Sequence, residues 1–472
     1  MALRQLVQAK PFQEISQVAE SLGFPAYVIG GYVRDHLLQR SQPKDIDIVT
    51  VGSGIELAQR VAQKLGTSRV AYFKNFGTAQ VKYEDLELEF VGARRESYRR
   101  DSRKPFVEDG SLEDDQNRRD FTINALAISL NPATYGELVD PFEGIQDLHQ
   151  GVIRTPLDPR RTFSDDPLRM LRAVRFACQL DFQLVPETRE ALEQEHSRLS
   201  IISAERISDE LHKIMAAPRP SRGLILLFET GLLEQFLPEV ARLAGVEEIE
   251  GQSHKDNFYH TAQVVDNIAE TTDKLWLRYA ALFHDIGKPV TKKFVKGIGW
   301  TFHHHEYVGG KMLKRIFHRM KFPLGGTLSY VKKLVELSSR PQAVADEQAT
   351  DSAARRLLFE AGEDLDDLML LAEADITTRN QRKKQRFLNN FQKVRRLLAE
   401  VEEKDHLRNF QPPLGGQEIM ELFDLEPGPE IGTIKNAVKE AILEGEIPNE
   451  RQAALDLARK IAGTRGHSPT SS

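Results

Sequence analysis

The hydrophobic pattern of the sequence changes near residue 150, and this change limits the folds that the chain can adopt. Before it, strand-like runs alternate with helical stretches; after about residue 160, apolar residues recur at three- and four-residue spacing. The predicted strands are AYVIGG, DIDIVTVG, TAQVKY and LELEFVG. The sequence therefore predicts an α+β N-terminal domain with a small mixed sheet and helices, followed by an all-α remainder.

Length and composition indicate several domains of an ordinary globular kind. The chain has 472 residues, of which 40% are hydrophobic and 28% charged, and its net charge is −6. No window approaches the roughly 18 apolar residues of a membrane span, and the charged N-terminus does not resemble a signal peptide. We therefore expect a cytoplasmic protein without a membrane role, as a monomer or a homodimer. Proline- and glycine-rich joints favour domains at residues 1–150, 151–220, 221–380 and 381–472.

Two aspartates share one face of the second predicted strand. Asp45 and Asp47 are two residues apart, so both project to one side while Ile46 and Ile48 project to the other. Paired carboxylates are stable where cations neutralise them, and hard oxygen ligands suit Mg²⁺ that carries phosphates. The pair predicts a two-metal phosphoryl-transfer site, although the spacing alone is also typical of a solvated strand edge.

A glycine turn precedes the aspartates. In VIGGYVRDHLL, Gly30 and Gly31 separate a short apolar strand from a helix, so that backbone N–H groups can approach a triphosphate, and Arg34 follows within reach of the phosphates. The turn followed by DxD resembles the nucleotidyltransferase head of the polymerase β superfamily. That resemblance implies a third carboxylate on a neighbouring strand, where LELEFVG offers Glu87 or Glu89; we favour Glu89.

Two further segments carry groups suited to a nucleotide. In RRDFTINALA, adjacent arginines can bind phosphates and Asp120 can accept from a ribose hydroxyl. Farther on, Asp166 precedes a helix with an arginine at every third position, which predicts a common face. An aspartate and an arginine three residues apart can offer an acceptor and forked donors to the edge of a base. The predicted nucleotide-binding residues of the two segments are Arg119, Asp120, Asn124, Asp166, Arg169, Arg172 and Arg175.

The motifs together resemble one family. GGYVRD with DID, RRDFTINALA, DDPLRMLRAVRFA and SAERISDELHKIM occur in the order found in class II tRNA nucleotidyltransferases, the CCA-adding enzymes, of the bacterial branch with an HD domain. The resemblance implies that Asp45 and Asp47 bind catalytic Mg²⁺ ions, that the match to RRD touches the ribose, and that Asp166 and Arg169 select CTP and ATP. Arg172 and Arg175 would lie toward the triphosphate.

The same resemblance implies the roles of the predicted domains. Residues 1–150 would form the catalytic head, 151–220 a nucleotide-selecting neck, 221–380 a helical body with the HD domain, and 381–472 a tRNA-binding tail. The enzyme would add CMP, CMP and AMP to the 3′ end of tRNA without a nucleic-acid template. Because side chains would read each base, the pocket must change between C and A addition. The segment 94–115, which is rich in both charge signs, is our candidate hinge, and a disordered surface loop is the alternative.

Histidines and aspartates of the helical part follow the order H, HD, D. His260 lies in a predicted helix, His284 and Asp285 in ALFHDIGKP, and Asp375 in LLAEADITTRN, with His305 as an additional candidate ligand. Imidazole and carboxylate together suit a divalent metal such as Mn²⁺ or Ni²⁺. This order resembles HD phosphohydrolases, which implies hydrolysis of phosphate esters at RNA ends; a retained site with weak or absent activity is the alternative.

Basic residues concentrate in RKKQRFLNNFQKVRRLL, around an apolar helical series. Such a stripe can bind the phosphates of tRNA, and a solvated charged face is the alternative. The predicted RNA contacts are Lys383, Lys384, Arg386, Arg395 and Arg396. Three other functions stay open: a specialist that adds only A or only CC, a poly(A) polymerase, and an HD phosphohydrolase whose head is a nucleotide-binding regulator.

Overall fold

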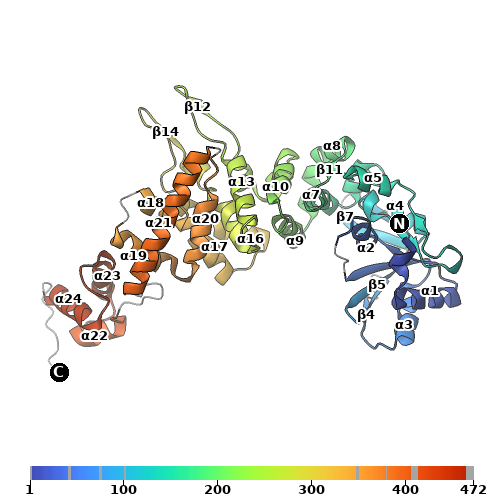
Figure 1. Cartoon of the computed structure of the whole chain (residues 1–472), viewed down its shortest axis with the longest axis horizontal. Coiled ribbons are helices and arrows are strands. Elements are labelled where there is room, and N and C mark those ends of the chain that lie inside the picture. Colours follow the sequence, from blue (N-terminus) through green and yellow to red (C-terminus); the bar gives the residue numbers. More distant parts are fainter. Residues whose placement is uncertain are drawn as a thin grey trace. The chain divides into compact units, whose positions relative to one another are not determined.

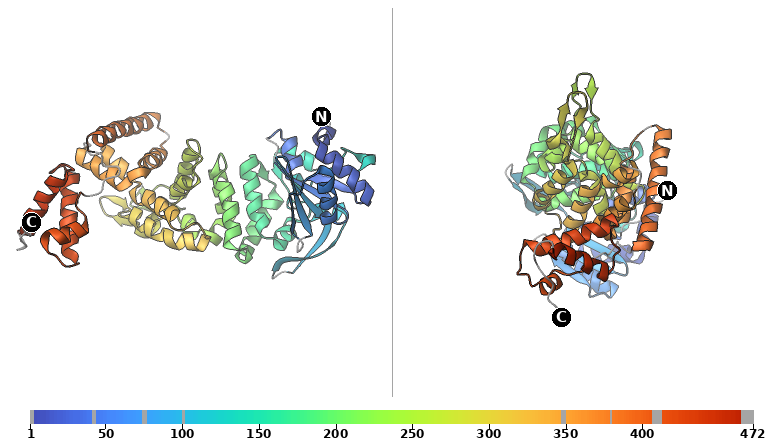
Figure 2. Two further views of the ribbon diagram at one scale, coloured as in Figure 1. Left: turned by 90° about the horizontal axis from the view of Figure 1, so that it is seen from below. Right: turned by 90° about the vertical axis from the view of Figure 1, so that its left-hand side faces the viewer.

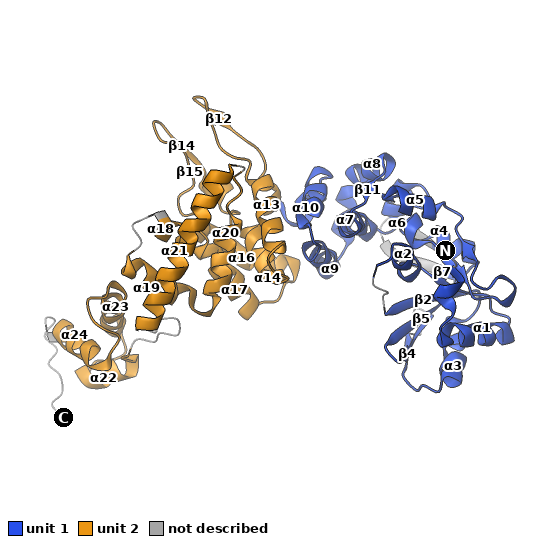
Figure 3. Cartoon of the chain, in the orientation of Figure 1, with its two compact units in different colours: residues 1–238 blue, residues 239–472 orange. Residues whose placement is uncertain are grey.

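The structure is a computed structural model that describes residues 3–40, 44–73, 77–99, 102–346, 350–378, 380–405 and 413–463. The chain divides into two compact units, residues 1–238 and 239–472 (Figure 3). No helix in these described ranges is both long and apolar enough to cross a membrane.

A mixed sheet forms the centre of the first unit. Its seven strands lie in the order β3-β4-β5-β2-β1-β8-β9, with β2 and β5 parallel and the other neighbours antiparallel. The four predicted strands occupy its middle, which confirms the predicted α+β head. The strands are β1 (Ala26–Ile29), β2 (Asp45–Thr50), β3 (Val70–Phe73), β4 (Thr78–Tyr83), β5 (Leu86–Gly92), β8 (Ala127–Ser129) and β9 (Leu138–Val139).

Helices cover one face of this sheet. α3 (Gly54–Leu65) packs on β4 and β5, and α1 (Lys10–Leu22) packs on α3 (Figure 1). Ile46, Ile48, Leu88 and Phe90 of the two parallel strands are almost fully buried. Because side chains alternate along a strand, Asp45, Asp47 and Glu89 project from the opposite face, which α1 and α3 leave open.

Helices of the first unit continue from the sheet toward residue 238. α7 packs against α9 and α10, and its Met170, Ala173 and Val174 are fully buried. The helices are α2 (Gly31–Leu37), α4 (Leu112–Asn117), α5 (Gly144–Gln150), α6 (Pro159–Asp165), α7 (Leu168–Leu180), α8 (Pro186–Glu195), α9 (Ala204–Met215), α10 (Pro220–Glu229), α11 (Leu232–Phe236) and α12 (Pro238–Ala241), the last of which spans the division between the units.

The segment predicted as a hinge, residues 94–115, contains regular structure. β6 (Arg94–Arg99) pairs with β7 (Ser102–Asp109), and α4 follows. Arg100 and Asp101 lie outside the described residues. A hinge in this segment stays a prediction, and the elements that it would move are a two-stranded sheet and a short helix.

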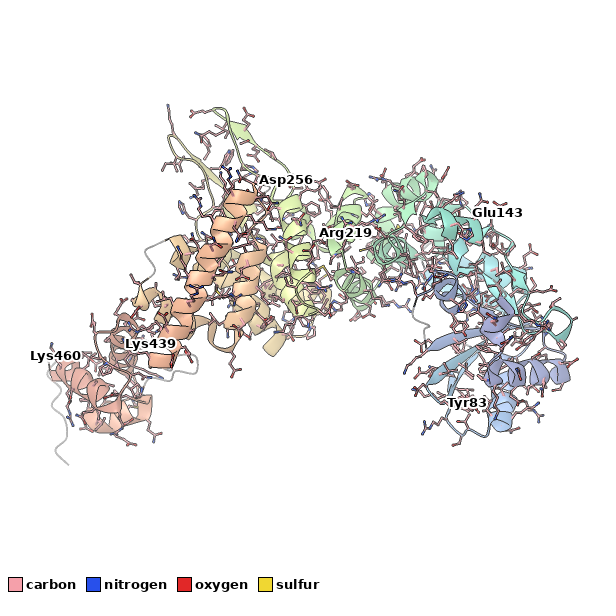
Figure 4. All side chains as sticks on the ribbon, viewed as in Figure 1. Tyr83, Glu143, Arg219, Asp256, Lys439 and Lys460 are labelled. Carbon is pink, nitrogen blue, oxygen red and sulfur yellow. The ribbon has the colours of Figure 1, made fainter. Side chains whose placement is uncertain are left out.

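The second unit is built mainly of helices. They are α13 (Asn257–Ala269), α14 (Leu275–Phe283), α15 (Lys288–Thr291), α16 (His305–Met320), α17 (Gly326–Leu337), α18 (Arg340–Asp346), α19 (Asp351–Ala361), α20 (Leu365–Ala374), α21 (Gln381–Asp405), α22 (Gly416–Phe423), α23 (Pro429–Glu444) and α24 (Arg451–Gly463). Asp256, labelled in Figure 4, caps α13 because its carboxylate accepts from the N–H groups of Phe258 and Tyr259.

Two hairpins interrupt the predicted all-helical pattern. β12 (Glu248–Ile249) pairs with β13 (Gln252–Ser253), and β14 (Lys293–Val295) pairs with β15 (Gly299–Thr301); both project from the same end of this unit (Figures 1 and 2). The prediction of helices throughout was wrong here. KGIGW, interpreted as a joint, is a hairpin turn in which Gly297 and Gly299 take φ values of 82° and 98°.

The contact between α3 and β5 gives a test of the packing. A Cβ on Gly54 would lie 2.8–3.0 Å from backbone atoms of Phe90, Val91 and Gly92, whereas one on Gly66 would meet nothing within 4 Å at a φ of 71°. We expect Gly54→Ala to destabilise the first unit by about 2–3 kcal/mol and Gly66→Ala by about 1 kcal/mol. Urea unfolding followed by circular dichroism measures the difference.

The two tryptophans provide an internal control. Trp276 and Trp300 both lie in the second unit, so tryptophan fluorescence reports its unfolding separately. Equal effects of the two substitutions on the circular-dichroism midpoint would contradict this account of the α3–β5 contact.

Candidate active site

The acidic residues of the head lie on the two parallel strands. Asp47 of β2 is in register with Glu89 of β5, and Asp45 with Glu87. Glu87 is already engaged, because it accepts from Gln80 Nε2 at 2.8 Å and pairs with Lys82. Burial, followed by the charges of Asp47 and Asp45, raises the pKa of Glu89. Glu89 therefore shares the electrostatic field of the aspartates, which favours it as the third carboxylate.

Asp47 is the most strongly desolvated member of this group. Burial is the largest cause of its raised pKa; Asp115 and Asp45 add to it, while Arg119 and Arg118 oppose it. A divalent cation at these oxygens would stabilise the ionised carboxylates, and hard oxygen ligands fit such an ion. Asp45 and Asp47 thus have the chemistry predicted for a metal site, with Asp45 exposed at its edge.

The glycine turn brings the backbone against this acidic group. Gly30 has a φ of 82°, and a Cβ there would lie 3.2 Å from Asp47 Oδ2 and 3.1 Å from Arg119 Nη1. Gly31 begins α2, and a Cβ on it would come no closer than 3.7 Å to Arg34 Nη2. Gly30 is therefore required by both its conformation and its neighbours, whereas Gly31 is not.

A buried hydrogen-bond chain connects the turn to α7. Arg34 Nη1 donates to Asn124 Oδ1 at 2.6 Å, Asn124 Nδ2 donates to Asp120 Oδ1 at 3.0 Å, and Arg172 donates to Asp120 Oδ2 at 2.6 Å. Burial alone would raise the pKa of Asp120, yet Arg172, Asn124 and Arg169 hold it at about 2. The side chains of Arg34, Asn124 and Asp120 therefore already have hydrogen-bond partners within this buried hydrogen-bond chain.

A pocket of about 820 Å³ lies over the acidic face of the sheet. At one side it exposes Asp47 and Glu89, and at the other Asp166, which connects α6 to α7. Of the predicted residues, Asp47, Glu89, Arg119, Asp120, Asp166, Arg169 and Arg172 line it. The other predicted residues of the head and neck are not among those that line it: Gly30, Gly31, Arg34, Asp45, Asn124 and Arg175.

Arg175 differs from the expectation for the three arginines of α7. It is buried, its Nη1 lies 3.2 Å from Glu210 of α9, and its guanidinium lies 4.3 Å from the centre of the Phe176 ring. Burial is the main cause that lowers the pKa of Arg175 to about 10. A three-residue step falls about 60° short of a helical turn, so Arg175 is rotated by about 120° from Arg169. The predicted common face was therefore wrong for Arg175.

One face of α9 completes the pocket, and the sequence prediction missed it. Four residues of α9 also line the pocket: Arg206, Asp209, Glu210 and Lys213. Their positions, i, i+3, i+4 and i+7, mark a single polar helix face, so the spacing in SAERISDELHKIM was the signal that could have identified them.

The predicted HD ligands come together in the second unit. His260 Nε2 lies 2.7 Å from Asp375 Oδ1 and 3.9 Å from Asp285 Oδ2. His284 Nε2 lies 3.3 Å from Asp285 and 3.6 Å from Asp375. Among the described residues, donor atoms of His260, His284 and Asp285 lie within 4.8 Å of one another, as a metal site requires. His305 Nε2 approaches Asp285 Oδ1 at 3.5 Å.

The protonation states of the histidines and aspartates in the HD cluster also favour the binding of a cation. His284 Nε2 is buried without a hydrogen-bond partner of good geometry, although it faces two carboxylates. Burial lowers the pKa of His284, but Asp285 and Asp375 more than reverse that effect. Burial lowers the pKa of His260. Two carboxylates directed at imidazole nitrogens are the donor set that a divalent transition metal uses.

The basic stripe predicted to bind RNA lies on α21. Phe391, Val394 and Leu398 are buried, whereas Lys383, Lys384, Arg386 and Arg396 are exposed. Arg395 differs, because its Nε donates to Glu373 Oε1 at 2.8 Å. RNA binding by this stripe stays a prediction.

Three segments of the chain match known protein families. Residues 26–154 match a poly A polymerase head domain, residues 181–243 a probable RNA- and SrmB-binding site of polymerase A, and residues 257–380 an HD domain. The A-adding tRNA nucleotidyltransferase of Deinococcus radiodurans is 34% identical over 75% of this chain and 81% of its own. The CC-adding tRNA nucleotidyltransferase of Thermus thermophilus is 30% identical over 91% and 92%. The chain belongs to the tRNA nucleotidyltransferase family.

Other family members are similar over different lengths. The CCA-adding enzyme of Lactobacillus helveticus is 38% identical over 50% of this chain and 56% of its own length. A tRNA nucleotidyltransferase solved with a primer tRNA and an incoming ATP analogue is 28% identical, with a TM-score of 0.56 over 82% of this chain and 99% of that one. The Thermotoga maritima CCA-adding enzyme shares the fold, with a TM-score of 0.60 over 98% of this chain and 99% of that one, at 20% identity.

The two glycines of the turn give a matched test of the nucleotidyltransferase site. In Gly30→Ala the new methyl group would press on Asp47 and Arg119 and strain the positive φ, so we expect nucleotide addition to fall by about a hundredfold or more. Gly31→Ala adds a methyl group at ordinary van der Waals distance from Arg34 Nη2 on a helix, and we expect a loss of only a few-fold. Single-turnover incorporation on tRNA measures both, with circular dichroism as the control for folding; equal losses would contradict the distinction.

Proposed function

We propose that this tRNA nucleotidyltransferase adds CMP, CMP and AMP from CTP and ATP to the 3′ end of tRNA. The pocket over the sheet carries the proposal, because it joins an acidic wall at Asp47 and Glu89 to Asp166 and Arg169 within about 820 Å³. That volume is of the size that encloses a small-molecule ligand. Relatives named for CC, A and CCA addition support the reaction class.

The residues of the nucleotidyltransferase site have two proposed roles in phosphoryl transfer, metal binding and triphosphate binding. The residues that would hold Mg²⁺ are Asp45, Asp47 and Glu89. In the reaction, the tRNA 3′-hydroxyl displaces pyrophosphate from the α-phosphate of the nucleotide. Bound Mg²⁺ would neutralise the negative charge that develops in that step. Arg119 and Arg172 line the pocket, and their guanidinium N–H groups that are not paired with Asp115 and Asp120 would donate to the triphosphate.

Asp166 and Arg169 are the proposed base-reading pair. Asp166 Oδ1 accepts from the N–H of Leu168 at 3.2 Å, which fixes the carboxylate and leaves Oδ2 as an acceptor. Arg169 Nη2 donates to the carbonyl of Arg118 at 2.5 Å, which fixes the guanidinium against the head. A held acceptor beside a held donor can distinguish cytosine and adenine from other bases by their Watson–Crick edges.

A specialist that adds only A or only CC is the second candidate. The A-adding and CC-adding relatives cover 75% and 91% of this chain, more than the 50% covered by the CCA-adding enzyme of Lactobacillus helveticus. Measuring which nucleotides the enzyme incorporates therefore distinguishes a CCA-adding enzyme from a specialist.

Incubation of the full chain with tRNA that lacks its CCA end tests the proposal. We expect CC with CTP alone, no extension with ATP alone, and CCA with both. Asp45→Ala and Asp47→Ala should each abolish extension, because each removes one of the β2 carboxylates proposed to hold Mg²⁺. A chain that stops at CC with both nucleotides, or that extends only tRNA ending in CC, would establish the specialist instead; unchanged extension without the aspartates would refute the site.

We also propose a phosphohydrolase activity for the HD cluster. The convergence of His260, His284, Asp285 and Asp375 supports it, since that set fits a divalent metal.

A 2′,3′-cyclic phosphate tests this activity. We expect hydrolysis that requires Mn²⁺, Ni²⁺ or Mg²⁺ and disappears in Asp285→Ala, while nucleotide addition persists in that variant because the cluster lies in the other unit. Absence of hydrolysis with all three metals would contradict the proposal, and Asp45→Ala serves as the reciprocal control.

A further inference from the structure

We propose that Lys255 binds the phosphate of the substrate at the HD cluster, and that metal binding to His260 frees it to do so. This inference rests on the phosphohydrolase function proposed above. It assigns the substrate class as a phosphate ester carrying at least one negative charge, and it makes metal and phosphate binding mutually favourable.

Lys255 contacts the cluster from outside the metal ligands. Its Nζ lies 2.7 Å from His260 Nδ1 and 2.5 Å from Thr377 Oγ1. On the other side of His260, Nε2 lies 2.7 Å from Asp375 Oδ1. The imidazole therefore separates the ammonium group of Lys255 from the carboxylates at which a metal ion would bind.

Hydrogen-bond chemistry fixes the tautomer of His260 in this arrangement. An ammonium group can only donate, so Nδ1 must accept from Lys255 and the imidazole proton must lie on Nε2, directed at Asp375. To hold a metal ion beside the carboxylates, His260 would offer the lone pair of Nε2, and its proton would then lie on Nδ1. There it has a ready acceptor, because Thr377 Oγ1 lies 2.9 Å from Nδ1. His260 stays neutral throughout.

The exchange of tautomer removes the acceptor of Lys255. Its ammonium group would then face an N–H group, which repels it, and it would keep only Thr377. Lys255 is exposed, and the side chain of Asp375 is 49% exposed, whereas His284 and Asp285 are buried. The freed ammonium group thus lies at the open side of the cluster, where a substrate enters.

Charge balance indicates what the freed group would bind. Asp285 and Asp375 neutralise a divalent cation, and the histidines that bind it are neutral. Lys288 Nζ, 2.7 Å from Asp285 Oδ2, already adds a positive charge. Lys255 and Lys288 together therefore leave the metal-loaded cluster with excess positive charge, which a phosphate ester compensates.

Equilibrium dialysis with labelled inorganic phosphate tests the inference. The parent protein is the full chain with Asp45→Ala and Asp47→Ala, so that the acidic site of the head contributes no metal-bound phosphate. We expect Mn²⁺ to raise phosphate affinity at least tenfold in the parent, and Lys255→Met to remove most of that gain. Lys293→Met removes the same charge from β14, where the side chain is exposed, and should retain the gain.

Mn²⁺ binding, followed by electron paramagnetic resonance, is the second readout. Lys255→Met should bind Mn²⁺ at least as tightly as the parent, because it lacks a nearby positive charge. Equal phosphate affinity in the two lysine variants, no gain from Mn²⁺ in the parent, or a tenfold loss of Mn²⁺ affinity in Lys255→Met would overturn the inference. If the expected binding is found but the parent hydrolyses no ester, the phosphohydrolase proposal fails and the phosphate site stands.

Discussion

The ion pair between Asp120 and Arg172 is the interaction on which the nucleotide pocket depends. Asp120 belongs to the head and Arg172 to α7, and their 2.6 Å contact is nearly buried on the side of the aspartate. A buried carboxylate is stable only when its oxygens are paired, so loss of Arg172 would leave Asp120 uncompensated. The pair therefore fixes α7, and with it Asp166 and Arg169, at a set distance from the acidic wall of β2 and β5.

The same pair extends into a longer buried network. Asp120 continues through Asn124 to Arg34, and the Phe176 ring packs against the guanidinium groups of both Arg34 and Arg172, at 4.8 and 5.5 Å. The glycine turn, the RRD segment and α7 thus form one rigid assembly. Several residues predicted to touch the nucleotide are held inside this assembly, where they position the groups that line the pocket.

Period-2 patterns predicted the head well, because the alternation in DIDIVTVG and LELEFVG is fixed by strand geometry and needs no knowledge of neighbours. The arginine series of α7 was interpreted less well, because a three-residue step drifts around a helix and only Arg169 and Arg172 reach the pocket. The α9 residues were missed although their spacing marks a polar helix face, because that spacing does not show that α9 packs on α7 and reaches the pocket. The pairing of Glu87 with Lys82 depends on the register of the neighbouring strands β4 and β5, which alternation within one strand does not fix.

The charged groups of the two candidate sites are arranged differently. In the head, Arg118 and Arg119 are already paired with Asp115, and the carboxylates of the acidic wall are desolvated with raised pKa values, so a cation is needed before a triphosphate can approach. In the HD cluster the histidines and carboxylates already compensate one another, and the lysines supply positive charge at the edge. The described residues that form each site lie within one unit, so a substitution in the HD cluster removes no charged group that lines the nucleotide pocket.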